Sequence, residues 1–331
     1  MRVGLTGVGR VGEVHLKNLC GSSGVSEVLV HDAHRARAES VAEEHGARVV
    51  TSFDDLLCSV DALVVASPTE THADILDRAI ARGVPTFCEK PVSTELVEIA
   101  DLAVTAAQSQ TDVQVGFHYR FDPALRTLAA GLSTTDGPHQ VRVHSTTEFA
   151  PSQEYLAGAG GLILDKLIHE LDMLRWLTGA EVSHVSALAL SPEAPASEPM
   201  TASLTLQLND GGLATIWGAY RSSAGFDLTV EVENTGGVQV MGSRRPATEM
   251  PTQVGPSKIT DFRDRFATAY ELEMTAFLDL AQGTGKNPSD LDEAVRTHQL
   301  VEAARTALLT GTVVAVEDIS PRQQSKGKTR T

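Results

Sequence analysis

The stretch Arg2-Val3-Gly4-Leu5-Thr6-Gly7-Val8-Gly9-Arg10-Val11-Gly12 decides the fold of the first third of the chain. Its apolar beginning predicts a short strand, and the apolar residues at 14, 16 and 19 predict an amphipathic helix after it. The first glycine permits a tight turn, the second lets backbone approach a pyrophosphate, and the third allows close packing of the helix. We therefore expect the phosphates of a dinucleotide at Gly7, Val8, Gly9, Arg10, Val11 and Gly12.

A second apolar run, residues 28–31, ends at Asp32, which lies twenty residues after Gly12 (32 minus 12). An acidic residue at this spacing accepts hydrogen bonds from ribose hydroxyls and repels a 2′-phosphate, so NAD is favoured over NADP. Arg35 and Arg37 weaken that preference, unless both lie on the solvated face of the helix expected over 33–44.

Alternating strand and helix patterns continue to residue 117 and are typical of a parallel sheet. The sheet reaches six strands with those expected at 48–50, 62–66, 86–88 and 113–117. Ser67, Pro68 and Thr69 follow the fourth strand at the carboxyl edge, where such sheets bind ligands, so we expect them to contact the cofactor. His72 is expected to contact it too, unless this residue only begins a helix.

The strand at 86–88 leads into Glu89-Lys90-Pro91. Pro91 has a fixed backbone angle and restricts the backbone of Lys90, so these residues predict a stiff turn rather than a helix. Glu89 and Lys90 are therefore expected among the cofactor-binding residues.

Residues 160–176 predict a buried helix that holds candidate catalytic residues. Apolar residues recur at helical spacing, and Asp165, His169 and Asp172, which are three and four residues apart, share a neighbouring face. Histidine titrates near neutral pH, so His169 is a candidate base for removing a hydroxyl proton. The alternative is a core helix with a satisfied histidine.

Together these motifs make the chain resemble the glucose-fructose oxidoreductase and inositol dehydrogenase family (Gfo/Idh/MocA). The resemblance rests on the glycine turn, on Cys88-Glu89-Lys90-Pro91-Val92, and on Gly160-Gly161 followed by Asp165 and His169. Within the family, the inositol 2-dehydrogenases are most similar, because of residues 114–123, 165–172 and 264–270. The likeness extends from residue 1 to about residue 310.

The resemblance implies a Rossmann NAD(P)-binding domain over 1–120 and an α+β domain over 121–319. The large, mostly antiparallel sheet of the second domain often packs against another subunit in this family, which implies a homodimer or homotetramer. Alternating patterns support such a sheet independently, with half-buried strands at 141–145, 203–208, 213–217 and 228–232 and a hairpin turn at 209–212. Helical patterns follow at 262–282 and 291–309, and a disordered tail is expected over 320–331.

The resemblance also implies the roles of three residues in hydride transfer between a secondary alcohol and a nicotinamide. His169 is the base, Lys90 donates a hydrogen bond to the reacting oxygen, and Asp165 pairs with Lys90 or holds a substrate hydroxyl. The expected substrate is an inositol-like cyclitol or a sugar, contacted by His118, Tyr119, Glu148, Tyr155 and Tyr270. The alternative for Tyr270 is that it only packs its own helix.

The substrate stays open at this point, because His118-Tyr119 precedes Arg120 where inositol dehydrogenases commonly carry Met or Asn and then Arg. An aldose dehydrogenase and an amino-cyclitol or amino-sugar dehydrogenase are alternatives within the family. A sensor that binds the dinucleotide without turnover is the alternative outside enzymes.

Charge, cysteine content and hydropathy bear on the partners, metal binding and location of the protein. The net charge of -16 (27 basic minus 43 acidic residues) disfavours nucleic acid as a partner. The three cysteines lie far apart without the spacing of metal ligands, so no metal site is expected and a reducing cytoplasm fits. No apolar run approaches the length that spans a membrane, and no signal core precedes the first strand, so a cytoplasmic protein is expected.

Overall fold

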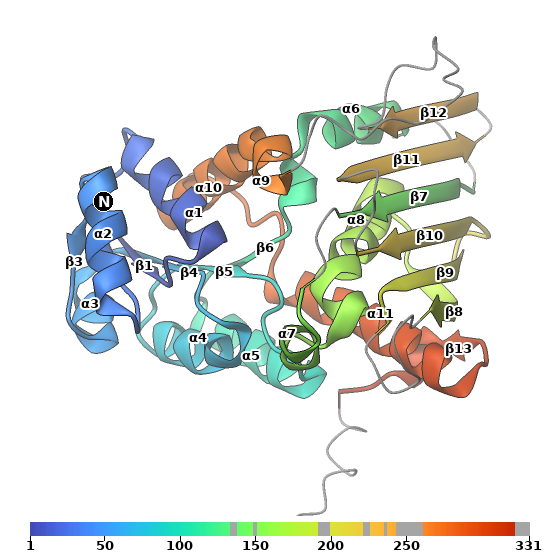
Figure 1. Cartoon of the computed structure of the whole chain (residues 1–331), viewed down its shortest axis with the longest axis horizontal. Helices are drawn as coiled ribbons and strands as arrows, with labels where there is room; N and C mark the ends of the chain where they lie inside the picture. The colour runs from blue at the N-terminus through green and yellow to red at the C-terminus, as the bar shows by residue number, and fades with distance from the viewer. Residues whose placement is uncertain are drawn as a thin grey trace, which may run out of the picture. The chain divides into compact units, whose positions relative to one another are not determined.

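The structure is a computed structural model that describes residues 1–132, 138–147, 151–190, 199–220, 226–234, 237–242 and 261–321. The chain forms two compact units, whose elements are drawn in Figure 1. The first unit comprises Met1–Phe121 and Phe266–Arg296, and the second comprises Asp122–Arg265 and Thr297–Thr331. This arrangement differs from a sequential division into 1–120 and 121–319, because the chain returns to the first unit at Phe266.

The first unit contains a six-stranded parallel sheet in the order β3-β2-β1-β4-β5-β6. The six predicted strands are thus confirmed, and the chain reverses direction across the sheet between β1 and β4, as in a Rossmann fold. The strands are β1 (Arg2–Thr6), β2 (Glu27–His31), β3 (Arg48–Val49), β4 (Ala62–Val65), β5 (Thr86–Glu89) and β6 (Val113–Gly116).

Helices cover both faces of this sheet. Figure 1 shows α1 and α10 on one face and α4 and α5 on the other. Crossovers between parallel strands are right-handed, so reversing the direction of travel across the sheet changes the covered face. The helices are α1 (Arg10–Gly21), α2 (Arg35–His45), α3 (Phe53–Ser59), α4 (His72–Ala81), α5 (Leu96–Ser109) and α10 (Ala267–Ala281), with 3₁₀ turns η1 (Thr69–Thr71) and η2 (His118–Phe121).

Apolar packing explains why α10 belongs to the first unit. Phe277 of α10 is fully buried in the same cluster as Leu16 of α1 and Phe87 of β5, and the rings of Phe87 and Phe277 lie 5.8 Å apart. The sequence pattern predicted one helix over 262–282, which is wrong in one respect. A short helix, α9 (Phe262–Arg265), ends before Phe266, and α10 begins after it.

The second unit contains a seven-stranded sheet in the order β12-β11-β7-β10-β9-β8-β13. Strands β7 and β10 pair in parallel, and every other pair between its described strands is antiparallel, so the predicted mostly antiparallel sheet is confirmed. Its strands are β7 (Gln140–Thr146), β8 (Val182–Leu190), β9 (Thr201–Leu208), β10 (Leu213–Ala219), β11 (Asp227–Asn234), β12 (Gly237–Gly242) and β13 (Val314–Ala315).

The strand register separates this sheet into a buried and an exposed face. Residues that pair across five strands lie side by side on one face, and one such row is buried throughout: Ala187, Leu204, Ile216, Val143 and Val230. The hairpin predicted at 209–212 joins β9 to β10, where the Leu208 N–H donates to the Gly212 carbonyl oxygen at 2.9 Å.

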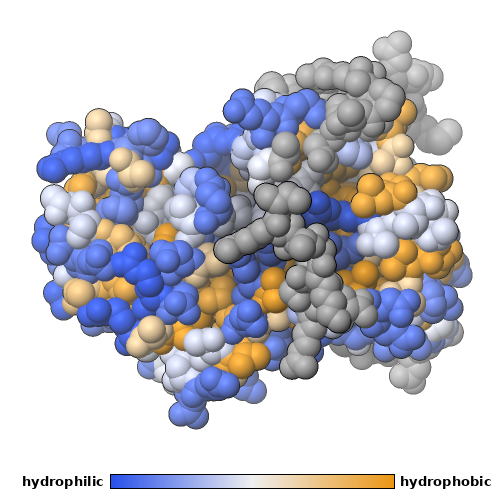
Figure 2. Space-filling model, turned by 90° about the horizontal axis from the view of Figure 1, so that it is seen from below, coloured by the Kyte–Doolittle hydropathy of each residue, from blue (hydrophilic) through white to orange (hydrophobic). Residues whose placement is uncertain are grey.

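The neighbouring row on the opposite face consists of Leu188, Ser203, Trp217, His144 and Thr229. Leu188 is 76% exposed and Trp217 is 38% exposed, so apolar side chains face outward here. The side of the molecule seen in Figure 2 mixes apolar and polar residues.

The helix predicted over 160–176 begins differently from a regular α-helix. Residues Ile163–Leu167 form a π-helical turn, and α8 (Ile168–Thr178) follows. Gly160 and Gly161 precede it with left-handed φ angles of +81° and +76°. A π-turn holds one residue more than an α-turn. Asp165 and His169, four residues apart, were expected on one face of a regular α-helix, and that expectation does not describe this segment.

The remaining helices of the described chain are α6 (Pro123–Leu132), α7 (Gln153–Gly158), α11 (Leu291–Thr310) and the 3₁₀ turn η4 (Val316–Asp318). Within the described residues, no helix combines the length and the apolar character needed to cross a membrane. The tail predicted over 320–331 lies outside the described residues from position 322 onward.

Candidate active site

The glycine turn joins β1 to α1 at the carboxyl edge of the first sheet. Gly7 has a left-handed φ of +89°, and its N–H donates to the carbonyl oxygen of His31 at 2.9 Å. Helix α1 begins after Gly9, whose carbonyl oxygen accepts from the Glu13 N–H at 2.9 Å. The N-terminal N–H groups of α1 therefore lie at this turn, where a helix stabilises phosphate.

Two of the three glycines are required by the fold, whereas the third leaves open space. A Cβ at Gly7 would lie 2.4 Å from the backbone nitrogen of Ser67, and a Cβ at Gly12 would lie 2.1 Å from the carbonyl oxygen of Gly7. A Cβ at Gly9 would meet nothing within 4 Å. The space at Gly9 fits the close backbone approach that a pyrophosphate needs.

Asp32 follows β2 at the same edge of the sheet. Its carboxylate accepts from the Val8 N–H at 2.9 Å, from the His34 N–H at 2.7 Å, and from the Arg37 guanidinium at 2.8 and 2.9 Å. Burial alone would raise the pKa of Asp32, but these hydrogen bonds and the Arg37 charge together hold the pKa below its usual value.

The loop after β4 is stabilised by hydrogen bonds from its own side chains. The Ser67 and Thr71 hydroxyls lie 2.7 Å apart, and the Thr71 hydroxyl donates to the Pro68 carbonyl oxygen at 2.7 Å. Thr69 begins the 3₁₀ turn η1 that leads into α4. The predicted residues Ser67, Pro68 and Thr69 therefore lie in one short, internally bonded loop.

His72 is buried behind this loop, with 1% of its surface exposed. Its Nδ1 lies 2.9 Å from the Pro91 carbonyl oxygen and its Nε2 lies 2.7 Å from the Ser67 carbonyl oxygen. Burial lowers the pKa of His72 more than the two carbonyl contacts raise it. Both ring nitrogens are used within the protein, so His72 joins two loops, and a direct cofactor contact stays a prediction.

Glu89 and Lys90 stand where β5 ends. The Glu89 carboxylate lies 2.7 Å from Nε2 of His15, a fully buried residue of α1, and it accepts from the Lys90 N–H at 3.2 Å. Burial alone would raise the pKa of Glu89, but His15, with the charges of His118 and Lys90, holds the pKa below its usual value. This pair connects the helix of the glycine turn to the end of β5, directly before Lys90.

Three of the predicted substrate residues gather in one buried aromatic cluster of the first unit. The rings of His118 and Tyr270 stack with centroids 4.7 Å apart, and Tyr119 lies 4.8 Å from His118. Phe266 contacts both His118 and Tyr119, with ring centroids 4.8 and 4.9 Å away. Only small parts of His118, Tyr119 and Tyr270 are exposed, namely 5%, 4% and 3%.

In the second unit, Asp165 receives hydrogen bonds from two phenols. Tyr155 of α7 donates to one carboxylate oxygen at 3.2 Å, and Tyr220 donates to the other at 2.5 Å. Burial, followed by the nearby charge of Asp165, raises the pKa of Tyr220 well above its usual value, so this phenol stays a donor. Sequence analysis missed Tyr220, although its place directly after β10 at the carboxyl end of the strand was a usable signal.

A buried polar network lies beside Asp165 and was also missed. Lys166 donates to the Ser145 hydroxyl, Ser145 donates to the Glu170 carboxylate at 2.5 Å, and Lys166 Nζ lies 3.4 Å from Glu170. Glu170 and Ser145 are fully buried and Lys166 is 8% exposed. The network ties the π-turn to strand β7 of the sheet.

The catalytic residues predicted from the sequence are divided between the units. Lys90 belongs to the first unit, whereas Asp165 and the half-buried His169 belong to the second. Asp172, which the helical pattern grouped with them, is fully buried and accepts from the Thr297 hydroxyl at 3.3 Å. The predicted substrate residue Glu148 lies outside the described residues.

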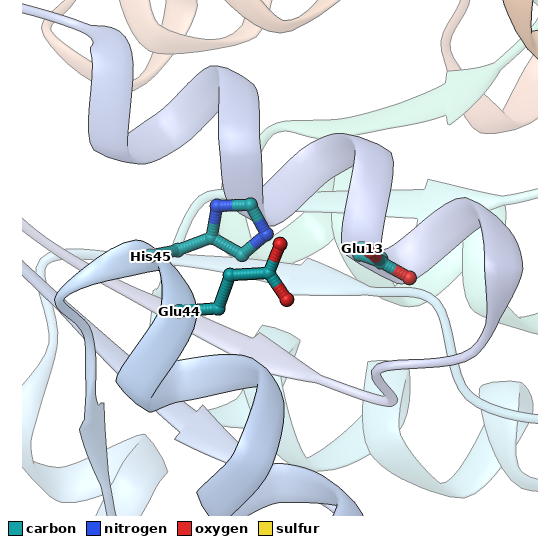
Figure 3. Close-up of side chains that lie close together, drawn as sticks. All are labelled: Glu13, Glu44 and His45. Atoms are coloured by element: carbon teal, nitrogen blue, oxygen red, sulfur yellow. The ribbon is translucent and has the colours of Figure 1, made fainter.

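Figure 3 shows a group of possible metal ligands on the surface of the first unit. Glu13 of α1 lies near Glu44 and His45 at the end of α2, with one donor atom of each within 4.8 Å of the others. Acidic side chains on solvated helices often gather without an ion. We assign no function to this group.

Two family models match the chain. One, described as an oxidoreductase family with an NAD-binding Rossmann fold, matches residues 1–117, and the other, the family's C-terminal alpha/beta domain, matches residues 136–316. The fold, the glycine turn and Asp32 accordingly define an NAD-binding oxidoreductase. The chain belongs to the glucose-fructose oxidoreductase and inositol dehydrogenase family (Gfo/Idh/MocA), which confirms the predicted family and cofactor.

Several relatives in this family carry names that refer to inositol. An inositol 2-dehydrogenase from Rhizobium meliloti is 32% identical over 291 residues, covering 84% of this chain and 88% of that protein. A scyllo-inositol 2-dehydrogenase (NAD(+)) from Bacillus subtilis is 31% identical over 310 residues, covering 89% and 90%. The crystal structure of a myo-inositol dehydrogenase from Corynebacterium glutamicum has a TM-score of 0.85 at 26% identity, covering 95% of this chain and 98% of that one.

Substitution at two of the glycines separates cofactor binding from folding. Gly9→Ala is expected to leave thermal stability unchanged, because its Cβ meets no atom of the protein, yet to weaken NAD binding at least about tenfold by filling the pyrophosphate space. Gly12→Ala is expected to lower the melting temperature as well, because its Cβ collides with the Gly7 carbonyl oxygen. Thermal unfolding and NAD titration of both variants test this, and equal melting temperatures would contradict it.

Removal of His15 is expected to make stability depend on pH in a defined direction. The lowered pKa of Glu89 means that the pair stabilises the fold above the unfolded-state pKa of Glu, and that this contribution is lost as pH falls. At pH 7, His15→Leu leaves a mostly buried carboxylate without this hydrogen-bond partner and should cost about 1–3 kcal/mol. The stability lost in His15→Leu should be smaller at pH 5 than at pH 7, because burial favours protonation of a Glu89 carboxyl that has lost its partner.

The control for this measurement is the double variant His15→Leu/Glu89→Gln, which removes the carboxylate charge together with its partner and should recover most of the stability at pH 7. Urea unfolding without NAD, at pH 5 and pH 7, provides the comparison. A deficit in His15→Leu that is the same at both pH values would show that the loss comes from packing instead.

Proposed function

We propose that the protein is an NAD-dependent dehydrogenase that transfers a hydride between a secondary alcohol of an inositol-like cyclitol or sugar and the nicotinamide. The observation that carries the proposal is the presence of Lys90, Asp165 and His169 at the motif positions of the family to which the chain belongs. The names of two relatives that are 32% and 31% identical to the chain support inositol-like substrates.

Oxidation of such an alcohol removes a hydride from carbon and a proton from the hydroxyl oxygen. NAD, when bound, supplies the hydride acceptor. In the proposed mechanism, His169 accepts the hydroxyl proton on a ring nitrogen, because imidazole exchanges protons near neutral pH. Lys90 Nζ donates a hydrogen bond to the same oxygen and stabilises the negative charge that develops on it.

Asp165 orients the substrate in this mechanism by accepting a hydrogen bond from a hydroxyl or by pairing with Lys90. The phenols of Tyr155 and Tyr220 donate to separate oxygens of its carboxylate, which restricts rotation of the side chain. A carboxylate held in this way loses less entropy when it binds a substrate hydroxyl.

His118 and Tyr119 favour a substrate that differs from plain inositol, because they replace the residues that inositol dehydrogenases commonly carry at this point. Together with Glu148, they support an amino-cyclitol or amino-sugar as the second candidate, and an aldose as a third. A non-catalytic sensor is the alternative in which the dinucleotide binds without turnover.

Formation of NADH by the purified protein tests the proposal with myo-inositol, scyllo-inositol, an amino-inositol and glucose as substrates. Lys90→Ala and His169→Ala are each expected to lower kcat about 10²–10⁴-fold while NAD binding is retained. Lys17→Ala changes an exposed lysine of α1 and serves as the matched control. Full activity in both active-site variants would refute the mechanism, and NAD binding without turnover of any substrate would favour the sensor.

We also propose that the protein is a cytoplasmic homo-oligomer, a dimer or tetramer, assembled through the exposed face of the second sheet. Leu188 of β8 and Trp217 of β10 offer apolar side chains on one face, with Ser203 of β9 between them. Trp217 also stacks on His144 with ring centroids 4.6 Å apart, which restricts the orientation of the indole. Exposed apolar surface of this kind is typical of protein interfaces.

Charge placed on this face is expected to separate the subunits. Leu188→Lys and Trp217→Lys should each shift the mass measured by light scattering from the oligomer toward the monomer, because a lysine would be buried without a partner. Val104→Lys is the control, since Val104 is 57% exposed on α5 of the first unit. An oligomer of unchanged mass in both sheet variants would exclude this face as the interface.

A further inference from the structure

The carboxylate of Asp32 has no acceptor site left for a ribose hydroxyl. A carboxylate offers about four lone-pair sites. One oxygen accepts from His34 N–H and Arg37 at 2.7 and 2.8 Å, and the other accepts from Val8 N–H and Arg37 at 2.9 Å each. The side chain is consequently only 3% exposed. One of these donors has to leave before the ribose of a dinucleotide can bind to Asp32.

Arg37 is the donor that can leave. The Val8 and His34 N–H groups belong to the glycine turn and to the start of α2, so the fold fixes their positions. The Arg37 side chain is 47% exposed, and a single guanidinium nitrogen bridges the two oxygens. Because about half of the Arg37 side chain already lies in water, the guanidinium can move into solvent when the ribose hydroxyls of NAD take its place at Asp32.

A 2′-phosphate on the same ribose meets a different environment from the one that Asp32 alone would create. Arg37 neutralises the Asp32 carboxylate and is itself a phosphate-binding group. The first turn of α2, all of which is described, carries no acidic side chain, and the N-terminus of a helix favours negative charge. Arg35 does not share this role, because its guanidinium pairs with Glu39 at 2.7 Å on an exposed face.

We propose that Arg37 sets the cofactor preference of this enzyme by competing with the ribose hydroxyls of NAD for Asp32 and by receiving the 2′-phosphate of NADP. The protein therefore binds NAD and also accepts NADP, with a smaller penalty than an aspartate at the end of β2 alone imposes. This inference rests on the family's NAD binding and is independent of the substrate proposed above.

Direct binding of NAD⁺ and of NADP⁺ to the full chain, measured by titration calorimetry, tests the proposal without any substrate. In the wild-type protein, the dissociation constant for NADP⁺ should exceed that for NAD⁺ by no more than about thirtyfold. Arg37→Ala should weaken NADP⁺ binding about tenfold, and should leave NAD⁺ binding unchanged or tighten it up to about threefold. The NAD⁺ titration also reports whether the variant is folded.

Arg35→Ala is the matched control, and it should change neither dissociation constant, while Arg37→Lys should give an intermediate ratio because it keeps the charge and loses the planar guanidinium. The proposal is overturned if Arg37→Ala changes both constants by the same factor, or if Arg35→Ala changes their ratio as much. It is also overturned if the wild-type protein binds neither nucleotide. Normal nucleotide binding without turnover would instead count against the proposed substrate alone.

Discussion

The buried pair between His15 and Glu89 is the interaction on which the functional edge of the first unit depends. His15 lies in the helix that begins at the glycine turn, and Glu89 ends the strand that leads to Lys90. The two side chains meet at 2.7 Å, where His15 is fully buried. Separating this pair would leave the mostly buried Glu89 carboxylate without its hydrogen-bond partner, so α1 cannot move relative to β5 at small cost. The glycine turn and Lys90 are thereby held in a fixed relative position.

The same edge is fixed from the other side by His72. Its ring lies between the carbonyl oxygens of Ser67 and Pro91, and so joins the loop after β4 to the turn after β5. In a parallel sheet the carboxyl ends of successive strands lie together, which brings loops that are distant in sequence to one place. His15 and His72 use this proximity, since each links one functional loop to the next through a buried imidazole. Neither histidine has to touch the cofactor to affect how it binds.

The parts of the structure that follow from local sequence signals were predictable, and those that depend on tertiary contacts were not. The glycine turn, Asp32 and the six strands carry strong local patterns, and each is present. The π-turn at Ile163–Leu167 has no such pattern, because hydrophobic spacing does not distinguish it from an α-turn of the same helix. Arg35 and Arg37 looked equivalent in the sequence, and only the direction of each side chain separates the one that meets Glu39 from the one that meets Asp32.

The two units hold their key carboxylates in different ways. In the first unit, backbone N–H groups of Val8 and His34 hold Asp32, and such contacts survive most substitutions. In the second unit, side chains hold Asp165, and Tyr220 makes the shorter of its two phenol contacts. Because the raised pKa keeps Tyr220 protonated, it positions Asp165 without taking up a proton. In the proposed mechanism, proton transfer then falls to His169.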